Sequence, residues 1–230
     1  NPIALAHLIK FRENIDTIFH LTCRDRNVIG LQAELLGAAA LGVHNILTLT
    51  GDKPSSGDHP DAKAVFEVDS QGLLTIAGLL NKGRDLAGNE LDEPTDFYIG
   101  TTGNPGADDL DAEYDKLAHR VELGANFVQT QPIYDLEKAA RFIEKVKPLG
   151  IPVMLGLIPL KSFKMATYLH TKVPGISLAP EILKRMEDGG KQAGLEIATE
   201  TLREIKKVAA GIHIMPLNDI DTVLYLVQHV

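Results

Sequence analysis

Polar side chains with the chemistry to bind a small molecule follow several short apolar runs in this sequence. In the clearest case, the run 44–49 is followed by Thr50, Gly51 and Asp52 and then by a loop rich in Pro, Ser and Gly. Buried parallel strands have this pattern, because the apolar run is enclosed and its end opens into small or polar residues. We therefore expect Asp52 to lie at the C-terminal end of a strand, where it is the first candidate for a catalytic carboxylate.

The other apolar runs end in the same way, and their ends together form a candidate site. The residues at these ends are His20, Thr22, Thr50, Gly51, Asp52, Thr102, Asn104, Gln131, Tyr134 and Asn218. The set combines one carboxylate with amides and hydroxyls, and it contains no zinc-ligand spacing and no Gly-x-Ser-x-Gly turn. Neutral hydrogen-bonding groups around one acid suit a flat heteroaromatic ligand better than a phosphoester or a peptide.

An alternation of strands and helices must position these residues. Strands are predicted at 17–22, 45–49, 97–101, 125–130, 152–157 and 211–215. Helices are predicted at 3–12, 28–41, around 73–80, at 110–123, 136–147, 162–170, 180–188 and 191–210, and at the C-terminus. Such alternation predicts an α/β fold with a parallel sheet, and a closed (β/α)₈ TIM barrel is the leading architecture.

Six strand–helix units are two fewer than a complete barrel requires. We therefore expect residues 1–230 to form a single catalytic barrel domain that lacks its first N-terminal strands. An open doubly wound sheet is the structural alternative. That fold normally shows a Gly-rich phosphate-binding turn after its first strand, and no such turn is present.

Composition restricts the class of partner. The net charge of −8, without a basic stripe, argues against a nucleic-acid partner. No apolar run reaches about 18 residues, so no membrane span is expected. The single cysteine, Cys23, excludes an internal disulfide and fits a cytoplasmic location. Arg24 and Arg26 beside it favour a thiolate, whereas a buried structural cysteine is the alternative interpretation.

Five segments at the predicted strand ends resemble the methylenetetrahydrofolate reductase family. The strongest are His-Leu-Thr-Cys-Arg-Asp-Arg-Asn at 20–27, Leu-Thr-Leu-Thr-Gly-Asp at 47–52, and Gly-Ala-Asn-Phe-Val-Gln-Thr-Gln-Pro at 124–132. Two more are Phe-Tyr-Ile-Gly at 97–100, which leads to Asn-Pro at 104–105, and Gly-Leu-Ile-Pro at 156–159. The resemblance implies an eight-stranded barrel that binds FAD. It also implies hydride transfer from NAD(P)H to 5,10-methylenetetrahydrofolate, which gives 5-methyltetrahydrofolate.

The resemblance also implies roles for individual residues. Asp52 resembles the catalytic aspartate beside the flavin and the folate, Gln131 resembles the glutamine that binds the pterin, and Asn218 lies at a substrate-binding strand end. The residues that match cofactor-binding positions are His20, Thr22, Thr50, Gly51, Asp52, Asn104, Glu113, Lys116, His119, Arg120 and Ala125. Among them Arg120 is a cation that can face the FAD pyrophosphate.

Two departures from the family pattern motivate an alternative function. The family's first strand carries a proton-donating glutamate that this chain does not contain, and Asp219 follows Asn218 where many members have arginine. The alternative is a folate- or pterin-binding barrel subunit, or a methyltransferase partner, that is not itself a reductase. A third interpretation is a phosphate-binding barrel enzyme that uses Lys161. In the leading interpretation the partners are folate and NAD(P)H, and the chain belongs to a homo-oligomer or to a larger polypeptide or complex.

Overall fold

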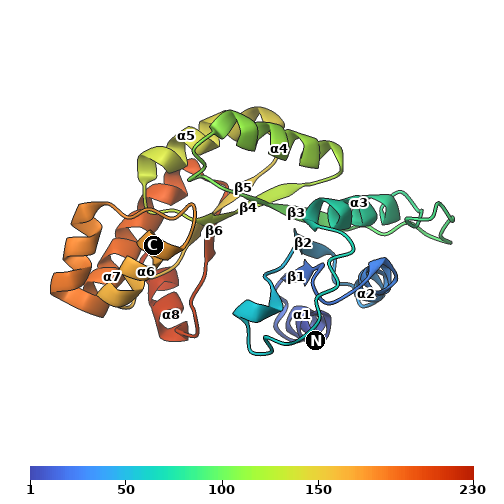
Figure 1. Cartoon of the computed structure of the whole chain (residues 1–230), viewed down its shortest axis with the longest axis horizontal. Coiled ribbons are helices and arrows are strands. Elements are labelled where there is room, and N and C mark those ends of the chain that lie inside the picture. Colours follow the sequence, from blue (N-terminus) through green and yellow to red (C-terminus); the bar gives the residue numbers. More distant parts are fainter. The chain divides into compact units, whose positions relative to one another are not determined.

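The structure is a computed structural model that describes all residues from 1 to 230. The chain divides into two compact units (Figure 1). Unit 1 contains residues 1–102 and 118–127, and unit 2 contains residues 103–117 and 128–230. No helix is long and apolar enough to cross a membrane.

Unit 1 is built on three strands whose bounds agree closely with the predicted ones. They are β1 (Ile18–Thr22), β2 (Asn45–Leu49) and β3 (Tyr98–Gly103, of which Gly103 belongs to unit 2). The strands are parallel, and the register places Phe19 opposite Ile46 and Ile46 opposite Ile99. These three side chains point to one face of the sheet, because side chains alternate along a strand.

Three helices cover that face of unit 1. They are α1 (Pro2–Glu13), α2 (Val28–Ala40) and α3 (Ser70–Leu80), and a short 3₁₀ turn, η1 (Pro54–Ser56), lies in the loop after β2. Leu31 and Leu35 of α2 and Leu73 of α3 are fully buried against the strand residues. Full burial of one such aliphatic side chain contributes about 1.5–3 kcal/mol. The core therefore fixes which face of β1 and β2 remains for polar residues.

The apolar residues Ile29, Leu31, Leu35 and Leu36 of the sequence predict a buried face for α2, and this prediction is partly wrong. Ile29 is 73% exposed and Leu36 is also exposed. The helix instead buries Leu31, Leu35 and Ala38, which follow the helical spacing of four and three residues. Almost every residue of α2 is apolar or small, so the sequence offers several possible faces and packing selects among them.

Unit 2 contains the other three strands. They are β4 (Phe127–Pro132, of which Phe127 belongs to unit 1), β5 (Val153–Leu157) and β6 (Gly211–Ile214). They are parallel and lie in sequence order, with Val128 opposite Val153 and Leu155 opposite Ile212. The register of β4 is irregular between Gln129 and Pro132, and the strand continues through Gln131 and Pro132, which were predicted to lie beyond its end.

Helices cover the strands of unit 2 as well. They are α5 (Leu136–Val146), α6 (Phe163–Lys172), α7 (Pro180–Val208) and α8 (Ile220–His229), with a 3₁₀ turn η2 (Lys147–Leu149), and α4 (Leu110–Glu122) begins in unit 2 and ends in unit 1. Ser162 accepts a bond from the Met165 amide and caps α6 as predicted. Gly190 has a non-helical backbone (φ 52°, ψ −133°), which confirms the prediction of two helical segments around this position.

In both units the strands are parallel, follow sequence order and alternate with helices. This confirms the predicted fold class, an α/β chain of the TIM-barrel type that contains six of the eight strands of a complete barrel. Candidate site residues from the sequence analysis lie at the ends of β1 and β2 in unit 1 and at the end of β4 in unit 2.

Candidate functional site

Gly51 brings the end of β2 close to the end of β1 in unit 1. Its φ is +90°, and a Cβ at this position would lie 3.0 Å from the Cβ of Thr22 and 3.3 Å from that of Arg24. Any larger residue at position 51 would press against Thr22 and Arg24. It would also have to adopt a backbone conformation that favours glycine. This close turn places Asp52 directly beyond the strand, where its side chain is exposed.

The two carboxylates near this turn differ in their environment. The Arg24 guanidinium donates to Asp25 through Nε (2.8 Å) and Nη2 (3.1 Å), and this bond holds the pKa of Asp25 below its ordinary value. Thr22 also donates to Asp25, at 3.5 Å. By contrast, Asp52 forms no hydrogen bond within the chain, although its charge makes a small contribution to the raised pKa of Arg24. Asp52 is thus the carboxylate that remains available to a ligand.

Cys23 has a structural environment. Its side chain is fully buried, and its thiol donates to the Leu49 carbonyl at 3.4 Å. Burial raises the pKa of Cys23 to about 11, with a further contribution from the charge of Asp69. The thiol is therefore protonated at neutral pH, which supports the structural interpretation over the thiolate.

Arg120 connects the end of α4 to the N-terminus of α3 within unit 1. Its Nη1 donates to the Thr101 hydroxyl and to the Thr102 carbonyl, both at 3.0 Å, and its Nη2 donates to the Ser70 hydroxyl at 3.3 Å. Ser70 is the first residue of α3, and its backbone amide donates to the Thr50 hydroxyl at 3.0 Å. A guanidinium beside a helix N-terminus is a favourable place for a phosphate group.

The remaining nominated residues of unit 1 occupy different environments. His20 is exposed on the sheet face opposite Phe19, and partial burial of its ring lowers its pKa, so the ring is neutral at pH 7. His119 contacts the Gln71 amide at 3.1 Å. Ala125 is only 3% exposed and lies in the helix-covered core, two residues before β4 begins, so it does not open the strand as predicted.

In unit 2, Asn104 is held by the first turns of α4. Its backbone amide donates to the Glu113 carboxylate at 2.8 Å, and its side-chain oxygen accepts from the Gly106 amide at 3.0 Å. Glu113 is only 7% exposed, and its other carboxylate oxygen is bonded to the Lys116 ammonium. Glu113 and Lys116 therefore fix the loop that carries Asn104.

Gln131 and Asn104 converge on one position in unit 2. The backbone at Gln131 is fixed by Thr130, whose hydroxyl donates to the Gln131 carbonyl (2.8 Å) and accepts from the Gly156 amide (2.9 Å). A Cβ placed on Gly175 would lie 2.8 Å from Oε1 of Gln131 and 3.0 Å from Oδ1 of Asn104. Two primary amides from different strand ends thus lie around the same point, and together they can donate to and accept from one planar ligand.

Sequence reasoning did not identify Gln129 as part of this region. Gln129 lies in β4, is only 4% exposed, and its Oε1 has no hydrogen-bond partner in the chain. An unsatisfied buried acceptor costs about 1–3 kcal/mol. A glutamine directly after the apolar Phe127 and Val128 of a buried strand was the signal that could have found it.

Asn218 lies in a strained loop at the end of β6. Leu217 and Asn218 both have positive φ (47° and 65°), and the Lys161 ammonium donates to the Leu217 carbonyl. Asp219 accepts from the Thr222 amide and so caps α8, and it pairs with Lys191 at 2.8 Å. These bonds hold the pKa of Asp219 at about 2, and they give both Asp219 and Lys161 structural partners.

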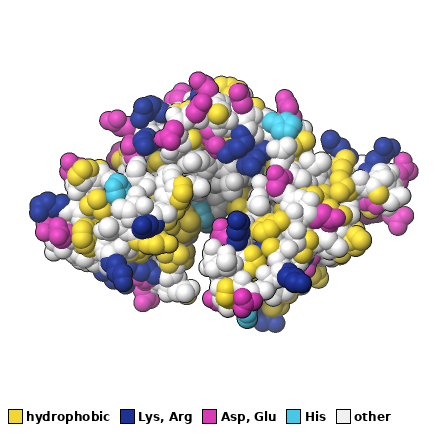
Figure 2. Space-filling view, in the orientation of Figure 1, with side chains coloured by type: hydrophobic (Ala, Val, Ile, Leu, Met, Phe, Trp, Pro, Cys, Tyr) yellow, Lys and Arg dark blue, Asp and Glu magenta, His cyan; other side chains and the backbone are white.

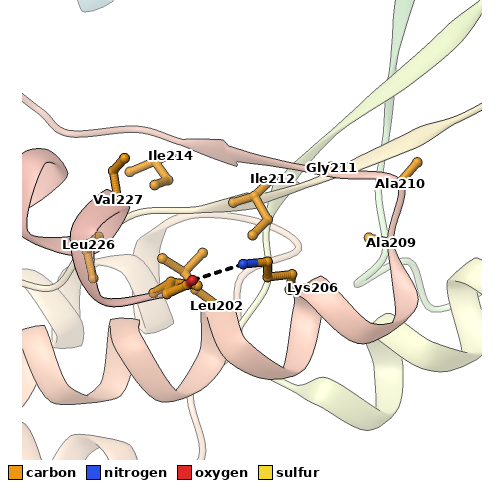
Figure 3. Close-up of a pocket in the computed structure, with 10 residues that line it drawn as sticks. Leu202, Lys206, Ala209, Ala210, Gly211, Ile212, Ile214, Leu226 and Val227 are labelled. Atoms are coloured by element: carbon orange, nitrogen blue, oxygen red, sulfur yellow. Dashed lines mark hydrogen bonds between the residues drawn. The ribbon is translucent and has the colours of Figure 1, made fainter.

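The pocket in Figure 3 has a different chemistry from the nominated site. It is a cavity of about 450 Å³ in unit 2, and it lies along β6 between α7 and α8. Its lining is mainly aliphatic, including Leu202, Ile212 and Leu226, and the Lys206 ammonium donates to the Val230 carbonyl at 2.9 Å. None of the nominated site residues lines it.

Charged side chains of both signs are interspersed on the face of the molecule shown in Figure 2. On the face shown in Figure 2, Lys and Arg side chains are mixed with Asp and Glu and do not gather into one stripe. No group of three or more His, Cys, Asp and Glu side chains could hold a metal ion.

Comparisons with known proteins connect these features to a family. The chain is 27% identical over 221 residues to methylenetetrahydrofolate reductase 1 of Schizosaccharomyces pombe, and the match covers 90% of this chain and 34% of that protein. It is 26% identical to 5,10-methylenetetrahydrofolate reductase of Pectobacterium carotovorum, which covers 86% of this chain and 64% of that protein. The chain therefore spans about one third of the yeast relative and less than two thirds of the bacterial one.

The fold is also found in a distant solved structure. The crystal structure of 2,3-dimethylmalate lyase, a PEP mutase/isocitrate lyase superfamily member, superposes with a TM-score of 0.53 at 12% identity, over 99% of this chain and 62% of that one. This likeness concerns the fold alone. The family model for methylenetetrahydrofolate reductase, in contrast, matches residues 2–230. This chain belongs to the methylenetetrahydrofolate reductase family.

Proposed function

We propose that this chain carries the flavin- and folate-binding residues of a methylenetetrahydrofolate reductase. The reaction is hydride transfer from NAD(P)H, through FAD, to 5,10-methylenetetrahydrofolate, which gives 5-methyltetrahydrofolate. The observation that carries the proposal is the family match over residues 2–230, in which Asp52 and Gln131 stand at strand ends with groups available to a ligand.

The donor set of unit 1 suits a flavin nucleotide. The neutral ring of His20 and the hydroxyls of Thr22 and Thr50 are uncharged partners for a heteroaromatic ring. Arg120, beside the N-terminus of α3, suits a pyrophosphate. When bound there, FAD would supply the hydride-transfer chemistry between the nicotinamide and the folate. The residues of the chain bind, orient and surround it.

Asp52 is assigned an electrostatic role. Its carboxylate is exposed and bonded to no group of the chain, whereas Asp25 nearby is bonded to Arg24. A negative charge at this position stabilises the positive charge that develops on the folate as its five-membered ring opens to an iminium. The same charge would disfavour added negative charge on a bound flavin, so Asp52 would favour the folate half of the reaction over the nicotinamide half.

Gln131 is assigned to the pterin of the substrate, as the resemblance implies. Asn104, which the resemblance matched to a cofactor-binding position, is reassigned to the pterin because its amide converges with that of Gln131 at Gly175. A pterin edge presents adjacent hydrogen-bond donors and acceptors, and a primary amide offers both. Gln131 is exposed at the end of β4 and is therefore accessible to the substrate. Asn218, at the end of β6, is likewise exposed and is assigned to the more distant part of the folate.

An absorbance spectrum of the purified protein, recorded before and after incubation with FAD, tests the proposal. The expected result is a flavin spectrum that is bleached by NADH or NADPH under anaerobic conditions and restored by methylenetetrahydrofolate. A protein that binds no FAD would overturn it. Folate binding without FAD binding, measured by titration calorimetry, would instead indicate the folate-binding subunit or methyltransferase partner considered above.

A further inference from the structure

The loop between α6 and α7 brings Gly175 against the two amides of unit 2. Gly175 has a φ of +83°, and a Cβ at this position would lie 2.8 Å from Oε1 of Gln131. The same atom would lie 3.0 Å from Oδ1 and 3.1 Å from Nδ2 of Asn104. Contacts as short as 2.8 Å are far inside the ordinary separation of carbon and oxygen atoms. The missing side chain is therefore what leaves room for the two amides.

The loop around Gly175 has little freedom to move away from the amides. Ile176 and Leu178 are buried in a core cluster of unit 2, and the Leu178 amide donates to the His170 ring at 3.2 Å. On the other side, a Cβ placed on Gly106 would lie 2.2 Å from the Gly175 carbonyl oxygen, so the two backbones are already in close contact. A side chain added at Gly175 would displace the amides more easily than the backbone.

We propose that Gly175 is a positioning residue for substrate binding: the absence of its side chain lets Gln131 and Asn104 converge into one recognition surface for a planar heterocycle with adjacent donors and acceptors. This inference rests on the proposed function, because it takes the ligand of Gln131 to be the pterin. Gly175 itself need not touch the substrate. It acts through the orientation of the Gln131 amide.

Replacing Gly175 with alanine tests this inference, with titration by 5-methyltetrahydrofolate as the probe. Gly175→Ala displaces one or both amides, and the loss of one neutral hydrogen bond weakens folate binding about three- to tenfold. Flavin reduction by the nicotinamide should be unchanged within about twofold, because the groups assigned to FAD in unit 1 are untouched. This split between the two half-reactions is the result that a merely structural role would not produce.

Gly150 provides a matched control in the same unit. It also has a positive φ (+69°), but a Cβ at Gly150 would meet no heavy atom within 4 Å. Gly150→Ala therefore shares the backbone strain of Gly175→Ala, without the contact to the amides. Folate binding should be unchanged in Gly150→Ala. Equal weakening in both variants would overturn the inference.

A double-mutant cycle separates the contact from a general loss of structure. In a Gln131→Ala background, Gly175→Ala should weaken folate binding by a clearly smaller factor, because the displaced amide is already absent. An equal factor in both backgrounds would contradict the inference. If Gly175→Ala alone is too unstable to purify, the double variant should regain thermal stability, and no regain would also contradict it. Thermal stability measured for the same four proteins separates this inference from the proposed function. If the proposed function fails, the wild-type protein binds no folate, while the thermal stabilities still show the coupling between Gly175 and Gln131.

Discussion

The strand ends of the two units place polar groups by different physical means. In unit 1 the groups carry charge and are bonded to one another: Arg24 pairs with Asp25, and Arg120 bonds the hydroxyls of Thr101 and Ser70. In unit 2 Glu113 and Lys116 fix the loop of Asn104, but the neutral amides of Asn104 and Gln131 converge through close backbone approach at Gly175. A region held by charge is sensitive to the removal of a charge, whereas a region held by shape is sensitive to added volume.

This contrast fits the two kinds of ligand that the proposed reaction requires. A phosphate-bearing cofactor needs a cation and a helix N-terminus, and unit 1 provides both at Arg120 and Ser70. The pterin ring is uncharged at its recognition edge, and amides read such an edge through the direction of their hydrogen bonds. Variants that change charge without volume, or volume without charge, should therefore separate the two regions.

The largest effect is expected at Arg120. Arg120→Gln removes a half-buried guanidinium that donates to Thr101, Thr102 and Ser70, and a bond to a charged group contributes about 1.5–3 kcal/mol. The free energy of unfolding, measured by urea titration, should fall by about 2–3 kcal/mol, and FAD binding should weaken. Arg24→Gln is the matched control, because its pair with the exposed Asp25 is worth about 1 kcal/mol or less. Equal losses of unfolding free energy and of FAD affinity in the two variants would show that Arg120 has no role beyond that of Arg24.

The next effect concerns the charge of Asp52. Asp52→Asn keeps the shape and removes the negative charge, so the folate half-reaction should slow by tenfold or more, about 1.4 kcal/mol. Flavin reduction should not slow, and the bound flavin should become easier to reduce. Stopped-flow measurement of each half-reaction and a redox titration check both signs. If neither half-reaction slows and the potential is unchanged, Asp52 is only a turn residue after Gly51.

A smaller effect is expected in the neutral region. Gln131→Ala should raise the folate KM by about two- to tenfold, since the loss of one hydrogen bond to an uncharged edge costs about 0.5–1.5 kcal/mol. Flavin reduction by NAD(P)H should remain close to that of the wild type in the same steady-state and stopped-flow assays. An equal loss of rate in both half-reactions would show that Gln131 contributes to cofactor binding as well as to folate binding, and the two units would then not differ in this respect.

The sequence predicted the strands and their polar ends because each strand is a short apolar run with an abrupt end. The bounds of β2 were predicted correctly, and those of β1 to within one residue. The sequence could not predict which face of α2 is buried, since Ile29 and Leu31 are equally apolar and only packing selects between them. The extension of β4 through Gln131 was missed for a related reason: the irregular register at Gln129–Pro132 lets the strand include a proline.

The convergence of Asn104, Gln131 and Gly175 could not be predicted from local pattern. Asn104 and Gln131 were candidate site residues in the sequence, whereas Gly175 lies in the loop between α6 and α7. Their proximity depends on tertiary packing: Glu113 holds the Asn104 loop, and the buried Ile176 fixes the loop of Gly175. The structural partners of Asp219 could likewise not be predicted, because its capping bond to α8 and its pair with Lys191 appear only in the fold.

Asp219 also allows the smallest prediction, which asks whether unit 2 depends on charge outside the pair of Glu113 and Lys116. The bonds with Lys191 and the Thr222 amide lower the pKa of Asp219 from 3.8 to about 2. A carboxylate whose pKa is lower in the folded state contributes stability above the unfolded pKa, and this contribution disappears as the pH falls through the folded pKa. The ionised pair therefore stabilises the chain at pH 5, contributes less at pH 3, and loses the rest of its contribution as the pH falls through about 2.

Asp219→Asn keeps a side chain that can cap α8 while it removes the charge. Its urea midpoint should lie slightly below that of the wild type at pH 5, and the two midpoints should converge as the pH approaches 2, because wild-type Asp219 is then protonated. Raising the salt concentration at pH 5 should reduce the difference, since Lys191 is largely exposed. A difference that persists undiminished at pH 2 would show that the carboxylate acts through geometry and not through charge, and unit 2 would then depend on shape at this position too.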